Sequence, residues 1–170
     1  MILDFNEYGL INPGIHEMDM DDFHISFVKQ FTTSQRRQLI FDSLLRFVAK
    51  MFKDFNIYEI WIDGSYVTEK INPNDVDIVI FFSVEDFIRV SKIWDVIRKD
   101  AVNIDPYCAV AVTEENKQKL SSADINTIIN KRNYWKGQFG FDREDRPKGI
   151  INIKADNIVE YIKGGESGVV

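Results

Sequence analysis

A polar segment between two apolar runs contains a glycine, a serine and two aspartates that are candidates for a ligand-binding site. Gly64 and Ser65 follow the first run, and Asp75 and Asp77 enter the second. A glycine lets the backbone approach a ligand closely and a serine adds a hydroxyl beside exposed amides, so this turn could cradle phosphate oxygens. On a strand, side chains two residues apart project to one face. The two carboxylates should therefore converge beside the turn.

Converging carboxylates suit a hard divalent cation. Mg²⁺ or Mn²⁺ is well matched to one or two carboxylates together with substrate phosphates. Two such ions about 3.5–4 Å apart would activate an attacking oxygen and neutralise a triphosphate and its leaving pyrophosphate. A third acid completes sites of this kind, and Asp105 is the candidate ligand. It precedes Pro106, so the alternative of a turn aspartate stays open.

An ordinary loop with two surface aspartates is the alternative to this site. We do not favour it, because aspartate is a poor strand residue, is costly to bury beside Val79 and Phe81, and repels a second carboxylate unless a cation or proton intervenes. No histidine is assigned to catalysis, since we expect His16 to be structural and His24 to lie on a helix surface. The acceptor hydroxyl could instead lose its proton to a metal-linked carboxylate.

Two lysines are candidates for contacting phosphates. Lys70 lies in the loop between the two runs, where phosphate contact and a solvated surface position both stay open. Lys148 lies in an aromatic and basic segment that could grip a triphosphate tail or stack a base, and we favour the functional interpretation for it. Asp63 is predicted to cap the turn and is left out of the metal set.

The elements that position these residues are predicted from apolar periodicity and turn residues. Their order predicts an α/β (α+β) domain. The basic residues of the second helix, which include Arg36 and Arg37, are predicted to form a solvated face. The expected elements are helices at 19–31, 34–55 and 87–100, a helix from 121 that ends in the aromatic stretch 134–140, strands at 58–63, 76–82 and 107–112, and a segment at 149–153 that is either a last strand or a helix lead-in.

Length and composition predict a single domain over residues 1–163, followed by a flexible tail over 164–170. The chain has 170 residues and a net charge of −6, which works against a large non-specific nucleic-acid surface. Its one cysteine, Cys108, excludes an internal disulfide. No apolar run is long enough to span a bilayer and the first residues lack the pattern of a signal peptide, so we expect a cytoplasmic protein with no membrane partner.

The segment from Gly64 to Val79 resembles the signature of the DNA polymerase beta-like nucleotidyltransferase superfamily. The likeness lies in the Gly-Ser pair, the spacer, and Asp-Val-Asp followed by an apolar run. The chain is also similar to an uncharacterised group of minimal bacterial and phage nucleotidyltransferases. That likeness rests on the Pro-Gly-Ile-His segment at 13–16, the Gly-Ser-Tyr-Val-Thr-Glu-Lys segment at 64–70, and an aromatic stretch from Trp135 that leads to Lys-Gly-Ile at 148–150.

This resemblance implies a nucleotidyltransferase fold, a mixed sheet with helices packed mainly on one face. It also implies Mg²⁺ at Asp75 and Asp77, and transfer of a nucleoside monophosphate from a triphosphate, with ATP as the first choice, to an acceptor that is a protein, an RNA or a small molecule. Lys70, like the family's lysine, would touch the triphosphate. The chain lacks the further domains with which larger members hold base and acceptor.

Two other functions stay open. The chain could be a non-catalytic nucleotide sensor, or an antitoxin or other regulatory partner that keeps the fold without turnover. It could also be an enzyme whose acceptor site is completed by a homodimer or a partner protein, because the chain is small. Nucleotide binding without a metal-dependent product would favour the non-catalytic reading.

Overall fold

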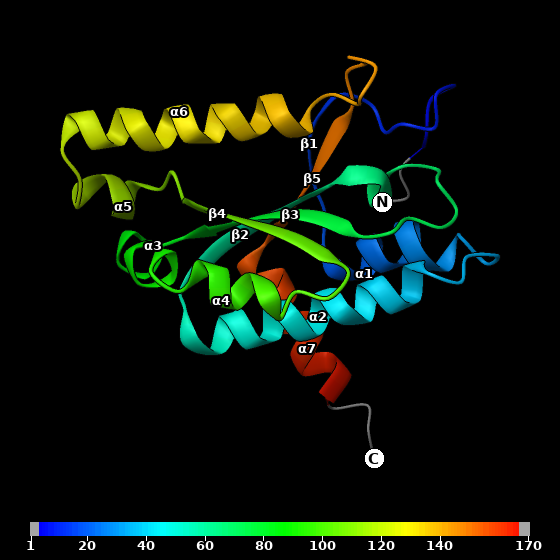
Figure 1. The fold of residues 1–170 in the computed structure, drawn as a ribbon, viewed down its shortest axis with the longest axis horizontal. Helices are drawn as coiled ribbons and strands as arrows, with labels where there is room; N and C mark the ends of the chain where they lie inside the picture. The colour runs from blue at the N-terminus through cyan, green and yellow to red at the C-terminus, as the bar shows by residue number, and fades with distance from the viewer. Residues whose placement is uncertain (1–3, 167–170) are drawn as a thin grey trace.

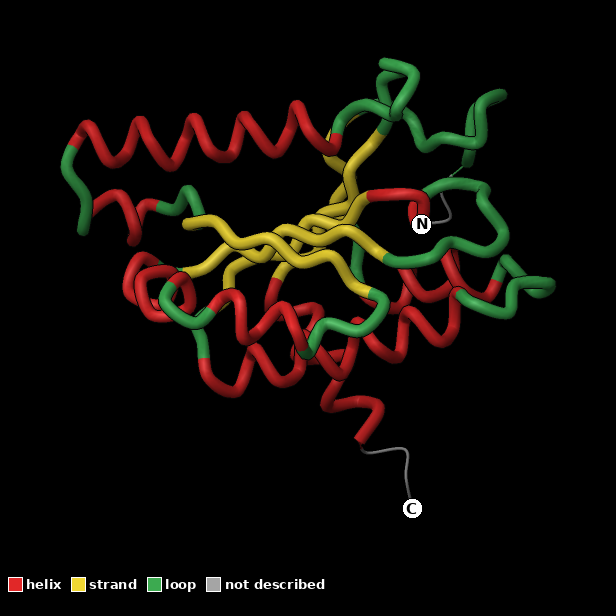
Figure 2. The backbone as a smooth tube through the Cα atoms, in the orientation of Figure 1, coloured by secondary structure: helices red, strands yellow, loops and turns green. Residues whose placement is uncertain are grey.

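A mixed five-stranded sheet forms the centre of the protein in this computed structural model, which describes residues 4–166 (Figures 1 and 2). The strand order is β1-β5-β2-β3-β4. The outer pairs β1/β5 and β3/β4 are parallel, while β2 is antiparallel to both of its neighbours. The expectation of an α/β domain with a mixed sheet is therefore confirmed. The strands are β1 (Gly14–Glu17), β2 (Ile57–Asp63), β3 (Val76–Phe82), β4 (Ile104–Val110) and β5 (Gly149–Lys154).

Most of the helices cover one face of this sheet. Figure 1 shows α1, α2, α3, α4 and α7 on that side, and α6 running across the other. The structure also has a short π-helix after α1 and a 3₁₀ turn, η2, directly after β2. Within residues 4–166 the α-helices are α1 (Met20–His24), α2 (Arg37–Asp54), α3 (Val84–Ser91), α4 (Trp94–Lys99), α5 (Glu114–Gln118), α6 (Ser122–Phe139) and α7 (Ala155–Glu166); the π-helix is Ile25–Lys29 and η2 is Gly64–Val67.

The alternation of β3 separates the two faces. Val76, Ile78, Ile80 and Phe82 enter the larger core, which also contains apolar residues of α1, α2 and α7. Residues of the opposite parity belong to a smaller core that α6 closes with Trp135 and Phe139. Asp77 shares that second parity, because side chains two residues apart on a strand project to one face. The acidic end of β3 therefore lies on the α6 side of the sheet.

Several boundaries differ from the sequence predictions. The helix expected at 87–100 is two helices, α3 and α4. Strand β4 begins at Ile104 and includes Pro106, which an edge strand tolerates because one row of its backbone groups has no ladder partner. Helix α6 continues through the aromatic stretch to Phe139, because Trp135 and Phe139 are four residues apart and both bury against the sheet.

Both ends of the chain add elements that periodicity did not predict. The segment that begins at Gly14 forms β1 and pairs with β5. The segment at 149–153 is a strand, and α7 follows it directly. We expected a flexible tail over 164–170. Helix α7 includes residues 164–166, and residues 167–170 lie outside those that the structure describes.

A buried ion-pair network anchors α6 to the sheet. Glu59 of β2 is only 6% exposed, and it accepts hydrogen bonds from Arg132 of α6 and, at 2.8 Å, from Lys154 of β5. Burial acts to raise the pKa of Glu59, but the two cations outweigh it, so the pKa lies below its ordinary value. This network stabilises the fold above the ordinary pKa of a glutamate and loses that effect as the pH falls through the lowered pKa.

Replacing Glu59 with glutamine tests this anchor. Removing one partner of a buried pair costs about 3–5 kcal/mol, and we expect a loss of about 2–4 kcal/mol at pH 7 because Lys154 is partly exposed. The free energy of unfolding, measured by urea titration, should differ less between the two proteins as the pH falls below about 4. A difference that stays constant with pH would contradict the role given to the Glu59 charge.

Candidate functional site

The turn after β2 lies against the carboxylate of Asp77. Gly64 has a φ of +80°, a conformation that other residues rarely adopt, and a Cβ atom added there would overlap Asp77 Oδ2. The predicted turn and the predicted acid are thus in contact, although 12 residues lie between them in the sequence. Only glycine satisfies both the backbone angle and the close approach.

Three aspartates lie side by side across three neighbouring strands. Asp63 of β2 pairs with Asp77 of β3, which pairs in turn with Asp105 of β4. Asp75 precedes β3 by one residue and adds a fourth negative charge nearby. Burial, followed by the charges of Asp75 and Asp105, raises the pKa of Asp77 to about 6. Negative charge is therefore concentrated at this end of the sheet.

Asp105 is part of β4 and not of a turn. Its Oδ2 accepts a hydrogen bond of 2.7 Å from the Tyr107 hydroxyl, and its Oδ1 lies 3.3 Å from Arg98 Nη2 of α4. The parallel register places Asp105 next to Asp77, but its carboxylate is engaged by these two side chains. Its role as a third metal ligand stays a prediction.

A buried ion pair balances one of the acids. Lys148, just before β5, is 6% exposed, and its Nζ lies 2.8 Å from Asp63 Oδ1. Burial raises the pKa of Asp63 to about 7, even though the Lys148 charge acts to lower it. Asp63 occupies the N-cap position of η2, as expected, but its side chain makes no capping hydrogen bond to that turn. Asp63 instead borders the same cleft as Asp75 and Asp77.

The cleft around these acids has a volume of about 780 Å³, within the usual range for small-molecule sites. One side is formed by the loop that follows Gly64, and the other by the end of α6 and the segment after it. Lys70 and Arg143 are both exposed and both line the cleft, and neither has an ion-pair partner among the residues described. The loop side comprises Gly64, Ser65, Thr68, Lys70, Asn74 and Asp75; the α6 side includes Tyr134, Gln138, Phe141 and Arg143.

Arg37 holds the loop side of the cleft in place. This arginine at the start of α2 is fully buried, and its Nη1 atom donates to the carbonyls of Phe27 at 2.8 Å and Tyr66 at 2.6 Å. Its Nη2 atom donates to the carbonyls of Thr68 at 2.7 Å and Lys70 at 2.6 Å. One guanidinium therefore satisfies four backbone acceptors, three of them in the loop that follows Gly64.

The prediction of a solvated basic face on this helix is therefore wrong for Arg37. Its neighbour Arg36 also contacts the loop region, donating to the Asn74 carbonyl at 2.7 Å. No local pattern marks either residue, because their partners lie far along the chain. The periodicity of α2 identifies which residues are apolar, but it does not reveal a buried cation.

The two histidines have structural partners. The His16 ring nitrogen Nε2 lies 2.6 Å from the Asn12 carbonyl, as expected for a structural histidine. His24 is half-buried, stacks on Phe41 with ring centres 4.3 Å apart, and hydrogen-bonds Tyr161 of α7 at 2.8 Å. The prediction of a surface position for His24 is therefore wrong. It packs α1 against α2 and α7.

The acids suit a divalent cation by their chemistry. Carboxylates are the ligands that Mg²⁺ prefers, and a cation would relieve the repulsion that raises the pKa of Asp77. Among residues 4–166, no three His, Cys, Asp or Glu side chains are grouped so that they could hold a metal as they stand. Asp75 and Asp77 border the cleft, while Asp105 is held by its two partners. Substrate phosphates would have to complete the coordination.

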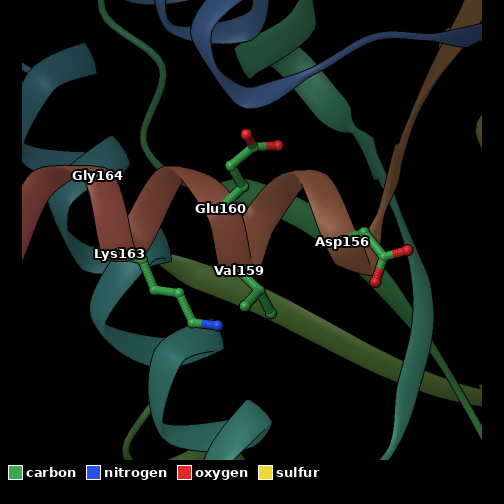
Figure 3. A pocket seen from close by; sticks show the side chains of 5 residues that line it. All are labelled: Asp156, Val159, Glu160, Lys163 and Gly164. Carbon is green, nitrogen blue, oxygen red and sulfur yellow. The ribbon is translucent and has the colours of Figure 1, made fainter.

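A second hollow, of about 450 Å³, lies on α7 (Figure 3). Its lining residues all belong to that helix, and the side chains of Glu160 and Lys163 point in different directions from it. A single helix encloses no ligand. None of the residues singled out in the sequence borders this hollow, so the cleft at the end of the sheet is the candidate site.

Replacing Gly64 with alanine should disrupt the site. The new Cβ would displace the Asp77 carboxylate, and the positive φ costs about 1–2 kcal/mol for alanine. We expect a folded protein that has lost divalent-cation binding, measured by calorimetry. Gly137→Ala is the matched control, because Gly137 lies in α6 with no atom near its added Cβ, where alanine is the better helix former. Unchanged cation binding by Gly64→Ala would contradict the site.

The molecule is thus a mixed α/β protein with a carboxylate-lined cleft at one end of its sheet. It belongs to the family of unknown function DUF6932, whose model matches residues 3–154. That span includes the five strands of the sheet and every cleft residue named above. No curated protein and no solved structure matches the chain. None of the described helices is long and apolar enough to cross a membrane.

Proposed function

We propose that the protein is a Mg²⁺-dependent nucleotidyltransferase with the nucleotidyltransferase fold, which moves a nucleoside monophosphate from a nucleoside triphosphate to an acceptor. The observation that carries this proposal is the contact between the Gly64 turn and Asp77, with Asp105 beside Asp77 on the next strand. A turn that binds phosphates and acids that bind a cation are thereby joined at one point. Both parts are needed for metal-assisted phosphoryl chemistry.

Each part of the cleft has a role in this reaction. Asp75 and Asp77 hold the cation, which when bound supplies positive charge to the triphosphate and the attacking oxygen. Gly64 and Ser65 present backbone amides and a hydroxyl to the phosphates. Lys70, exposed at the cleft, adds a positive charge to the triphosphate.

The acceptor hydroxyl attacks the α-phosphorus, and the bond to pyrophosphate breaks as the new bond forms. Asp105 would either accept the proton of the acceptor hydroxyl or bind the metal as a further ligand, since it neighbours Asp77 and is partly exposed. Lys148 keeps Asp63 charge-balanced beside the site. Its direct contact with a nucleotide stays a prediction, because its ammonium is already engaged.

The test is incubation of the purified protein with each α-³²P-labelled nucleoside triphosphate, Mg²⁺ or Mn²⁺, and cell extract. We expect label from one nucleotide, with ATP as the first choice, to appear on a protein, an RNA or a small molecule. The Asp75→Ala/Asp77→Ala protein should give none. Equal labelling by this double variant would overturn the assignment.

A non-catalytic nucleotide sensor or regulatory partner is the second candidate function. It is favoured by the engagement of Asp105 with Arg98 and Tyr107, which would leave a cation with fewer ligands. In that case the protein should bind a triphosphate saturably and form no product with any extract. If the acceptor site is instead completed by a second copy of the chain or by a partner protein, transfer should appear when that component is added.

A further inference from the structure

The α6 side of the cleft exposes two large aromatic rings that the proposed chemistry does not use. Tyr134 of α6 is 49% exposed, and Phe141, just after this helix, is 48% exposed. Both border the cleft that holds Asp75 and Asp77. Scattered exposed aromatics are common, but two rings at the rim of one polar cleft indicate a binding surface.

The packing of α6 fixes the position of the Tyr134 ring. Trp135 and Phe139 are buried in the smaller core and hold this end of α6 on the sheet. Tyr134 packs edge to face against Trp135, with ring centres 5.1 Å apart, and Lys131 Nζ lies 4.5 Å from the centre of the Tyr134 ring. The ring is thus supported from within its own helix while half of its surface stays accessible.

A free amide lies beside the rings. Gln138 is one helical turn after Tyr134, so the two side chains share a face of α6. It is exposed, borders the cleft, and its amide has no hydrogen-bond partner among the residues described. A glutamine amide offers one donor and one acceptor side by side, the pattern that matches the N6 and N7 edge of adenine.

We propose that this side of the cleft is a nucleobase subsite, in which Tyr134 and Phe141 stack a purine ring and Gln138 reads its edge. The inference rests on the proposed function, because it places the base of the same triphosphate whose phosphates lie at Gly64 and Ser65. It adds the residues that would bind the base and that would select an adenine nucleotide. Arg143 borders the same cleft, and its positive charge acts against the burial and the neighbouring carboxylates that raise the pKa of Asp77.

Comparing the affinity of the protein for Mg-ATP with its affinity for Mg-tripolyphosphate distinguishes the contribution of the base from that of the phosphates. Stacking on an aromatic side chain contributes about 1–3 kcal/mol per base, so the wild-type protein should bind ATP about ten-fold or more tightly than tripolyphosphate. Tyr134→Ala/Phe141→Ala should lose that advantage and keep its affinity for tripolyphosphate. Ile129→Ala is the control, because Ile129 is an exposed apolar residue of α6 that does not border the cleft.

The role of Gln138 has its own comparison. ATP should bind several-fold more tightly than inosine triphosphate, which replaces the 6-amino group with an oxygen, and Gln138→Ala should reduce this preference. Equal binding of ATP and tripolyphosphate to the wild type, or an unchanged advantage in the double variant, would overturn the subsite and leave the proposed function standing. Failure of both ligands to bind would overturn both. A variant that binds ATP normally but transfers poorly would assign the rings to the acceptor and overturn the base assignment.

Discussion

Replacing Asp77 with asparagine should abolish nucleotidyl transfer and leave the fold intact. Asparagine has nearly the same shape but lacks the charge that holds a cation, and loss of such a contact costs several kcal/mol of transition-state stabilisation. We expect the transfer rate to fall by at least about a hundred-fold. The measurement is initial-rate transfer of labelled nucleotide at saturating Mg²⁺, with circular dichroism to verify folding.

The same variant should lose activity but gain stability at pH 7, so its free energy of unfolding gives a second test. Burial, followed by the charges of Asp75 and Asp105, raises the pKa of Asp77 to about 6, so the folded protein favours its protonated form. Without divalent cations, both proteins should lose stability as the pH rises, because the pKa of Asp63 is also raised, but the wild type should lose more than Asp77→Asn between about pH 4 and 6. At pH 7 the variant should be more stable by about 1–3 kcal/mol, and the difference should vanish below about pH 4.

The control for Asp77→Asn is Asp95→Asn. Asp95 is an exposed aspartate in the first turn of α4, away from the cleft. Its replacement should leave the transfer rate unchanged. A folded Asp77→Asn protein that transfers at the wild-type rate would remove Asp77 from the site.

Arg37→Met should have the largest effect on stability. The methionine fills part of the space but leaves four backbone carbonyls without their donor, and each unsatisfied buried group costs about 1–3 kcal/mol. We expect a loss of at least about 3 kcal/mol in the free energy of unfolding, even if some of the carbonyls reach water. Denaturant titration measures this loss.

Arg37→Lys keeps the positive charge, and it tests the positioning of the 66–70 loop separately from the stability of the whole protein. An ammonium group lacks the planar fork that reaches acceptors on several segments at once, so we expect a folded protein with a looser 66–70 loop. Backbone amides of that loop should exchange hydrogen faster, and triphosphate affinity should fall with them. Arg46→Lys, at an exposed position of the same helix, is the control. Wild-type exchange in the 66–70 loop of Arg37→Lys would contradict the positioning role.

Local patterns predicted the central part of the site well. Strands β2 and β3 are continuous apolar runs, and the glycine and aspartates at their ends stand out because these residues are unfavourable in strand interiors. The structure places Gly64 against Asp77 as that pattern indicated. The two-residue period also predicts that Asp77 projects to the opposite face from Val76 and Ile78.

Long-range pairings could not be predicted from these patterns. Arg37 contacts carbonyls 10, 29, 31 and 33 residues away, and nothing near it in the sequence indicates burial. The position of Asp105 depends on the parallel register of β3 and β4, which is set by the packing of the whole sheet. The Lys148–Asp63 pair joins residues from opposite halves of the chain for the same reason. The sequence prediction ended helix α6 in its aromatic stretch, because aromatic and charged residues without clear periodicity are also typical of an anchored loop.

The most direct measurement is a crystal structure of the protein with Mn²⁺ and a non-hydrolysable ATP analogue, using the anomalous signal to locate the metal. We expect Mn²⁺ bound by Asp75 and Asp77, the triphosphate along Gly64 and Ser65, and the adenine against Tyr134. A nucleotide bound elsewhere, or one bound in the cleft with no metal at Asp77, would contradict the claim that this acidic cleft is a nucleotidyl-transfer site.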